Sequence, residues 1–130
     1  MALRWRQQLN ENAKMLAHHA VFPEQNHNEV VGWEQPAELL SRAAVVVLRD
    51  RDDHPRVKHR LDLAVPLAAE AGATVHTVES RGESLLQRLC WLVVVGDWVS
   101  LYSSFLNQVD PTPVTKIDGL KSRLERIGAA

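Results

Sequence analysis

The sequence has little of three features that mark common protein classes: cysteine, net charge and long apolar runs. Its single cysteine, Cys90, excludes an internal disulfide and favours a reducing cytoplasmic compartment. Fifteen basic and sixteen acidic residues leave a net charge of −1, without the basic excess of nucleic-acid-binding modules. The longest uninterrupted apolar run, Leu89–Val95, is far shorter than the roughly 20 residues that cross a bilayer. We therefore expect neither nucleic acid nor a membrane as a partner.

The sequence also lacks the glycine patterns of several large enzyme classes. It contains no G-x-G-x-x-G or P-loop motif for phosphates and no G-x-S-x-G nucleophile elbow. What is present is the composition of an ordinary globular protein, with 45% apolar and 24% charged residues in 130. This size and balance predict one folded domain over residues 1–130.

Two apolar segments predict the strands of a parallel sheet. Ala43–Leu48 is apolar throughout and ends at a charged run. This pattern is typical of a strand that is buried on both faces. Ala73–Val78 alternates valines with polar residues. Between them we expect a helix of about 16 residues, with Asp53 as N-cap, Pro55 in its first turn and Gly72 at its end. Strand, helix and strand then form a right-handed βαβ unit in an α/β fold.

Helices are expected over most of the remaining chain. Apolar spacing predicts a helix over Leu3–Ala20, and Leu85–Val109 is too long for a strand and predicts a buried helix. Thr112 as N-cap and Pro113 at the first helical position predict a last amphipathic helix. Because two strands make a poor open sheet, we also expect weaker strands, for instance near Glu29–Trp33, or a partner domain.

Four titratable residues allow either a structural or a chemical interpretation. Glu11 shares a polar helix face with Lys14. Glu11 either forms a solvated ion pair with Lys14 or is a carboxylate that moves a proton. His27 lies among residues with amide and carboxylate side chains. It is either a loop residue that forms hydrogen bonds with the backbone or a proton donor. In the last predicted helix, Lys121 and Lys116 are either solvated or available to an anion or a proton transfer. Spacing alone leaves these alternatives open.

Other polar groups fit structural roles. Arg49 and Arg51 follow the first strand, where α/β sheets bind ligands, and they fit either a phosphate ligand or ion pairs with Asp50, Asp52 or Asp53, of which we expect the ion pairs. Asp97 lies in an apolar run and requires a hydrogen bond from a loop or a helix N-terminus. Cys90 lies in an apolar helix, which indicates an inert thiol. We expect no metal, because no closed zinc motif is matched by His18, His19, His27 and Glu24.

Several segments, taken in order along nearly the whole chain, resemble the bacterial and archaeal bifunctional phosphoglucose/phosphomannose isomerases. The most specific is Pro-Glu-x-x-His-Asn-Glu over residues 23–29, followed by Gly32-Trp33. The others are Asn-Glu-Asn-Ala-Lys at 10–14 and the segments 48–56, 96–102, 109–113 and 117–121.

This resemblance implies a fold, a reaction and partners. The family is built from two sugar-isomerase (SIS) domains, and this chain resembles the second, which implies a three-layer α/β/α architecture with a mostly parallel sheet. The first domain, with its Ser/Thr-rich loop for the sugar phosphate, has no counterpart here and is an expected partner, as is a second copy in a homodimer. The family interconverts glucose 6-phosphate or mannose 6-phosphate with fructose 6-phosphate through an enediolate, without a cofactor.

The resemblance also assigns roles to residues. It places the carboxylate that moves the proton between C2 and C1 at Glu11, and the histidine that opens the sugar ring at His27. The lysine that assists ring opening falls on Lys121, with Lys116 as the alternative. Two other functions stay open: a non-catalytic sugar-phosphate-binding or regulatory SIS module, and a dimerisation domain that uses the long apolar helix.

Overall fold

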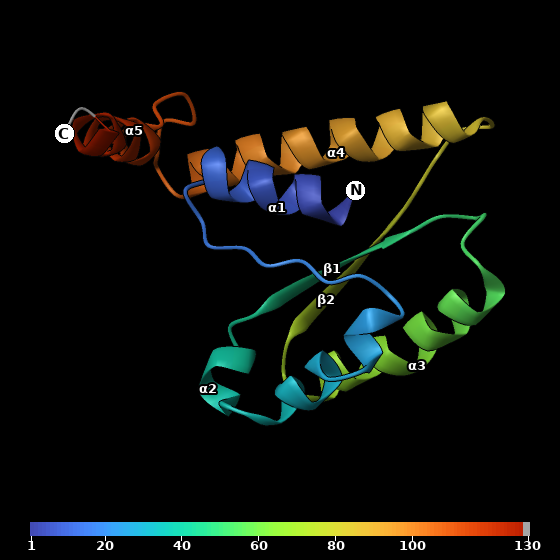
Figure 1. Ribbon diagram of the computed structural model, residues 1–130. Coiled ribbons are helices and arrows are strands. Elements are labelled where there is room, and N and C mark those ends of the chain that lie inside the picture. The colour runs from blue at the N-terminus through green and yellow to red at the C-terminus, as the bar shows by residue number, and fades with distance from the viewer. Residues whose placement is uncertain (129–130) are drawn as a thin grey trace.

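A two-stranded parallel sheet lies at the centre of the computed structural model, which describes residues 1–128 (Figure 1). The strands pair without offset, from Ala44 opposite Thr74 to Arg49 opposite Glu79. The elements are, in chain order, α1 (Ala2–Glu11), η1 (Glu24–Asn26), η2 (Glu29–Glu34), α2 (Ala37–Leu40), β1 (Ala44–Arg49), α3 (Pro55–Glu70), β2 (Thr74–Glu79), α4 (Leu85–Leu106) and α5 (Thr115–Gly128). In the view of Figure 1, α1 and α4 lie on one side of the sheet, and α2 and α3 lie on the other.

The predicted strand–helix–strand unit is confirmed. β1 and β2 match the two predicted strands to within one residue, and α3 connects them. α3 turns Leu61, Ala64 and Ala68 inward, and all three are buried, as is Val47 on β1. Burial of these apolar side chains is the main force that holds a helix against a sheet. The α/β class with a parallel sheet is therefore confirmed.

The weak strand predicted near Glu29–Trp33 is wrong, because this segment forms the 3₁₀ helix η2. Its backbone groups bond locally, as when the Val31 N–H donates to the Asn28 carbonyl at 3.1 Å. A strand would require a neighbouring strand for the same groups. The apolar run is short, and Val31 stays 60% exposed, so burial does not favour an extended conformation.

The first helix is shorter than predicted: α1 ends at Glu11, not at Ala20. The Asn10 side chain bonds to the backbone of Ala17, accepting from its N–H at 3.1 Å and donating to its carbonyl at 3.3 Å. Asparagine side chains compete in this way with the helical hydrogen bonds of the backbone. Lys14 then takes a left-handed conformation with φ of 53°. The chain beyond Glu11 therefore leaves the helix axis and crosses toward η1 (Figure 1).

Two predicted helix caps are also wrong. His54, not Asp53, caps α3, where its Nδ1 accepts from the Arg56 N–H at 3.2 Å. Asp53 lies one residue too early and instead accepts from the Asp50 N–H at 2.9 Å. α5 begins at Thr115 because Thr112 is held in a turn, where its N–H donates to Asp110 Oδ1 at 2.9 Å. Two details are confirmed, namely Pro55 in the first turn of α3 and a left-handed Gly72.

The long apolar helix forms but ends at Leu106 and not at Val109, and it is not buried within the described part of the chain. Ser84 precedes α4 as its N-cap in a capping box, in which the Ser84 hydroxyl accepts from the Gln87 N–H. One side packs on α1, while Leu86, Trp98 and Tyr102 are 70%, 52% and 59% exposed. The inert Cys90 expected in this helix is exposed as well. By length and composition alone α4 is apolar enough to span a membrane, a test that core helices of soluble proteins also pass.

The contact between α1 and α4 depends on a tryptophan that packs on a glycine. Trp5 is 5% exposed, and its Nε1 donates to the Leu92 carbonyl at 2.9 Å. A Cβ on Gly96 would lie 2.5 Å from that Nε1 and 2.7 Å from Cε2. Both contacts are closer than real Cβ atoms allow, and an indole ring cannot bend away. Gly96 is thus required for the close approach of the two helices.

We expect Gly96→Ala to destabilise the chain by about 1–3 kcal/mol, since α1 must move outward to clear the new methyl group. Gly119→Ala is the matched control, because Gly119 also lies within a helix but a Cβ there meets no atom within 4 Å. That change should stabilise α5 by up to about 1 kcal/mol through helix propensity alone. Urea unfolding of both variants measures the difference, and equal effects would contradict the packing argument.

Candidate functional site

Glu11 lies at the C-terminal end of α1, on the wall of a cavity of about 530 Å³. The opposite wall is the segment that leads into α5 and the first turn of that helix. Of the two predicted lysines, Lys116 lines the cavity, and Lys121 lies further along α5 outside its lining. The lining residues are Asn10, Glu11, Lys14, Met15, Leu16, Pro113, Val114, Thr115, Lys116 and Ile117. A carboxylate and an ammonium group therefore share a space large enough for a small ligand.

Lys14 does not form the predicted side-chain pair with Glu11. Because α1 ends at Glu11, the two side chains are no longer neighbours on a helix face. The Lys14 ammonium donates instead to the backbone carbonyls of Glu11 at 2.7 Å, Pro113 at 2.6 Å and Pro111 at 3.3 Å. This residue connects the two walls of the cavity.

His27 lies in another part of the structure. It follows η1 directly, its N–H donates to the Glu24 carbonyl at 2.9 Å, and it is exposed. η1 and η2 lie near α3, whereas the C-terminal end of α1 lies beside α4 and α5 on the other side of the sheet (Figure 1). A single chain therefore does not bring His27 to the cavity that Glu11 lines.

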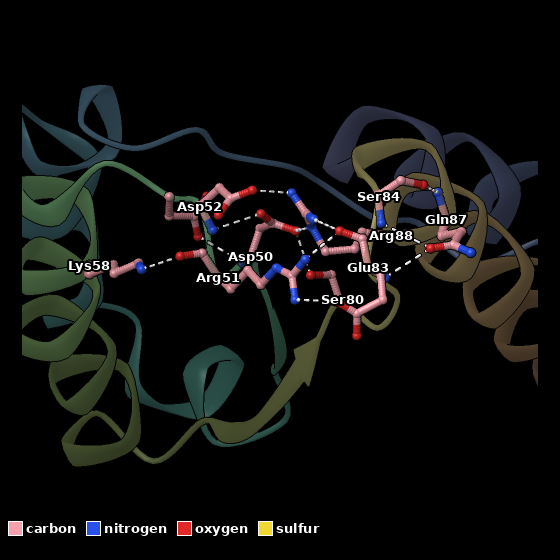
Figure 2. A network of polar contacts seen from close by, with 10 residues as sticks. Asp50, Arg51, Asp52, Lys58, Ser80, Glu83, Ser84, Gln87 and Arg88 are labelled. Carbon is pink, nitrogen blue, oxygen red and sulfur yellow. Dashed lines mark hydrogen bonds and ion pairs between the residues drawn. The ribbon is translucent and has the colours of Figure 1, made fainter.

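A polar network joins the carboxyl ends of both strands to the start of α4 (Figure 2). At its centre is Arg88, whose side chain is only 4% exposed. Its Nε donates to Asp50 Oδ2 at 2.8 Å, its Nη2 donates to Asp52, and its Nη1 donates to the Glu83 carbonyl at 3.1 Å. The Ser80 hydroxyl donates to the same oxygen of Asp50. This edge of the sheet, where α/β folds often bind ligands, is thus filled by the protein's own side chains.

Arg88 has no predicted role, and three other charged residues have partners that differ from those predicted. Arg49 pairs with Asp62 of α3 at 2.5 Å, and Arg51 pairs with Glu83 at 3.5 Å, so their predicted pairing with the neighbouring aspartates is wrong. Asp97 accepts both of its bonds from Arg4 of α1, at 2.8 and 3.0 Å, rather than from a loop or a helix N-terminus. Arg88 has one local signal, as a charged residue one turn into a mostly apolar helix, but that position does not indicate its partners Asp50 and Asp52.

The network lowers the pKa of Asp50 to about 2 from its ordinary value of 3.8. The hydrogen bond from Ser80 is the largest cause, and the bonds from the Asp52 backbone and from Arg88 act in the same direction, against the opposing effect of burial. Hydrogen bonds to the charged form favour ionisation of a carboxyl group. Asp50 therefore carries a negative charge at the end of β1 throughout the neutral and mildly acidic range.

This shift makes stability depend on pH in a defined window. Because the pKa of Asp50 is lower in the folded chain, its contribution is complete above about pH 4 and is lost as the pH falls toward 2. We expect a loss of about 1 kcal/mol across that range, allowing for solvent screening. Urea unfolding at pH 6, 4, 3 and 2 measures it. Ser80→Ala should reduce the loss, and an unchanged pH profile in that variant would contradict the assignment.

The histidines do not gather around a common point. His18 Nε2 lies 3.8 Å from a carboxylate oxygen of Glu29, and its ring lies 6.0 Å from that of His19. Across residues 1–128, the structure places no three His, Cys, Asp or Glu side chains where they could hold a metal ion together.

Comparison with known proteins gives a consistent result. The family described as the bacterial phosphoglucose isomerase C-terminal SIS domain matches residues 1–124. Proteins named bifunctional phosphoglucose/phosphomannose isomerase are similar over nearly the whole chain. That of Caldicellulosiruptor bescii is 44% identical over 127 residues, that of Aquifex aeolicus 37% over 126, and that of Thermoplasma acidophilum 30% over 124. These alignments cover 95–98% of this chain but only 38–39% of the relatives. No solved structure matches the chain significantly.

Proposed function

Because the chain belongs to the family of bacterial phosphoglucose isomerase C-terminal SIS domains, we propose that it supplies part of the active site of a sugar-phosphate isomerase. The enzyme interconverts glucose 6-phosphate and mannose 6-phosphate with fructose 6-phosphate, in the cytoplasm and without a metal or organic cofactor. The observation that carries this proposal is the position of Glu11, a carboxylate at a helix end on the wall of a 530 Å³ cavity.

Glu11 acts as the base in this proposal. In the open-chain aldose it takes the proton from C2, which gives an enediolate, and it returns a proton to C1. The C2 hydroxyl loses its proton and the C1 oxygen gains one, so that the C1 carbonyl becomes a hydroxyl and the C2 hydroxyl becomes a carbonyl. The reaction is redox-neutral overall and requires no oxidant or reductant. A positioned carboxylate is suited to both transfers because it alternates between base and acid.

His27 opens the sugar ring by transferring a proton at the ring oxygen, and a lysine assists it. The resemblance assigns that lysine to Lys121, and the cavity wall offers Lys116 for the same role. Since η1 and the end of α1 lie on different sides of the sheet, we propose that a second copy of the chain in a homodimer supplies His27 to the cavity. The site is then assembled between subunits.

The remainder of the enzyme is the first SIS domain, which binds the phosphate group. This proposal agrees with the length of the relatives, of which the chain covers 38–39%. It also agrees with the large apolar side chains that α4 leaves exposed, such as Phe105 and Leu106 at 61% and 82%. For this domain we propose the three-layer α/β/α architecture with a mostly parallel sheet that the resemblance implies.

The test is isomerase turnover, followed as fructose 6-phosphate formed from glucose 6-phosphate and from mannose 6-phosphate. The chain is assayed alone, mixed with a first SIS domain, and as a chimera that replaces the matching part of the Caldicellulosiruptor bescii enzyme. We call the mixture or chimera the assembled enzyme. Turnover only in the assembled enzyme supports the proposal. Turnover by the chain alone would contradict the need for a first domain, and binding without turnover would favour a regulatory sugar-phosphate module.

A further inference from the structure

Lys14 has an unusual conformation and an unusual set of partners. It is a non-glycine residue in the left-handed region, with φ of 53°, at the point where the chain turns away from α1. Its ammonium group has three N–H donors, and three backbone carbonyls accept from it. Two of those carbonyls, of Pro111 and Pro113, lie 97 and 99 residues further along the chain. The side chain therefore holds together two segments that are far apart in sequence.

The segments that Lys14 joins are the two walls of the cavity. One acceptor is the carbonyl of Glu11 itself, and the other two lie in the turn that leads into α5. A second bond holds the chain beyond α1 near this turn, from Asn107 Nδ2 at the C-terminal end of α4 to the Ala13 carbonyl at 2.9 Å. α5 has no buried residue anywhere in its described span, Thr115–Gly128, so packing contributes little to its placement. The hydrogen bonds in the turn before α5 are therefore important for the position of this helix.

We propose that Lys14 is a positioning residue for the isomerisation, a role that rests on the proposed function of Glu11 as the base. It fixes the end of α1 against the turn before α5 and thereby sets the separation of Glu11 from Lys116 and from the bound sugar. Lys14 does not bind the substrate, because its three donors are engaged by carbonyls. A displacement of about 1 Å in a catalytic group is sufficient to reduce a rate by about 100-fold.

The experiment compares Lys14→Met and Lys14→Arg in the assembled enzyme. We expect Lys14→Met to lower kcat for glucose 6-phosphate by about 10- to 100-fold and to change KM by less than about twofold. Lys14→Arg should recover most of kcat, since a guanidinium also donates to several carbonyls. Lys58→Met is the matched control, because Lys58 also donates its ammonium to a backbone carbonyl, that of Arg51, but away from the cavity.

Two outcomes would overturn the proposal. A KM that rises at least tenfold with unchanged kcat would make Lys14 a substrate ligand, and unchanged kcat and KM would make it dispensable. If Lys14→Met fails to fold, Asn107→Ala removes the bond that holds the chain beyond α1 to the end of α4, and it should lower kcat in the same way with unchanged KM. Full turnover by Glu11→Gln would instead refute the assignment of the base, whatever the Lys14 variants do, so the two failures are distinguishable.

Discussion

Glu11→Gln is expected to stop isomerisation in the assembled enzyme while sugar-phosphate binding persists. Glutamine keeps the size of the side chain but cannot take a proton from carbon. Loss of a general base lowers a rate by about 10²- to 10⁴-fold, so kcat should fall by about 10³-fold. The measurement is kcat for glucose 6-phosphate, together with exchange of the C2 hydrogen with deuterium from solvent, which should disappear as well. Exchange reports on the proton transfer at C2, which follows ring opening and does not require the product to form.

Glu70→Gln is the matched control, because Glu70 is an exposed glutamate at the end of α3, remote from the cavity. It should leave kcat, KM and thermal stability unchanged. Loss of binding together with turnover in Glu11→Gln would contradict the role of a base and favour a binding or structural role. Retained hydrogen exchange would exclude Glu11 from the proton transfer altogether.

The parts of the fold that could be predicted are those whose signal is local. Ala43–Leu48 is a continuous run of apolar residues that ends in charges, and such a run favours a strand. The expected burial on both faces is not found in the described residues, where Val47 alone of β1 is buried and Val46 is 39% exposed. A helix of the right length follows, with Pro55 at its start and Gly72 beyond its end. Because each of these signals depends on neighbours in sequence, the βαβ unit was correct to within one residue.

The predicted helix boundaries are wrong where a side chain forms a hydrogen bond that competes with those of the helix backbone. The end of α1 depends on whether Asn10 bonds to Ala17, and the start of α5 on whether Asp110 bonds to Thr112. Periodicity does not encode these choices. The exposure of α4 has another cause, since an apolar helix is buried only if a partner covers it. The sequence predicts the apolar face but not what covers it.

In the candidate site, too, sequence signals predicted some residues but not the contacts between residues that are far apart in sequence. The resemblance to the isomerase family predicted Glu11, His27 and Lys121, with Lys116 as the alternative lysine, and the structure places Glu11 and Lys116 on one cavity. The three bonds of Lys14 join residues up to 99 positions apart, so no spacing rule could have identified them. Arg88 was missed for a similar reason, because its partners Asp50 and Asp52 precede it by 38 and 36 residues.

Arg88→Met is expected to produce the largest loss of stability in the chain. The methionine fills a similar volume but leaves the carboxylates of Asp50 and Asp52 without their cation at the end of β1. Removal of the cation leaves the Asp50 carboxylate, which is 22% exposed, partly desolvated without its partner, whereas Asp52 is 67% exposed and stays hydrated. We expect the thermal midpoint of unfolding to fall by about 5–10 °C. Arg88→Lys keeps the charge but cannot reach both aspartates and the Glu83 carbonyl in the same geometry, so its loss should be smaller.

Two further variants identify the cause of that loss. Arg60→Met removes an exposed arginine from α3 and should shift the midpoint by less than about 2 °C. Asp50→Asn in the Arg88→Met background should recover part of the stability, since the unpaired charge is then gone. If the two changes are simply additive, Arg88 and Asp50 are not coupled, and the network in Figure 2 does not stabilise the fold through their ion pair. Recovery would instead establish that the ion pair of Arg88 with Asp50 holds the start of α4 to the carboxyl end of β1. Because α1 packs on α4, the same ion pair then helps to position α1 and Glu11.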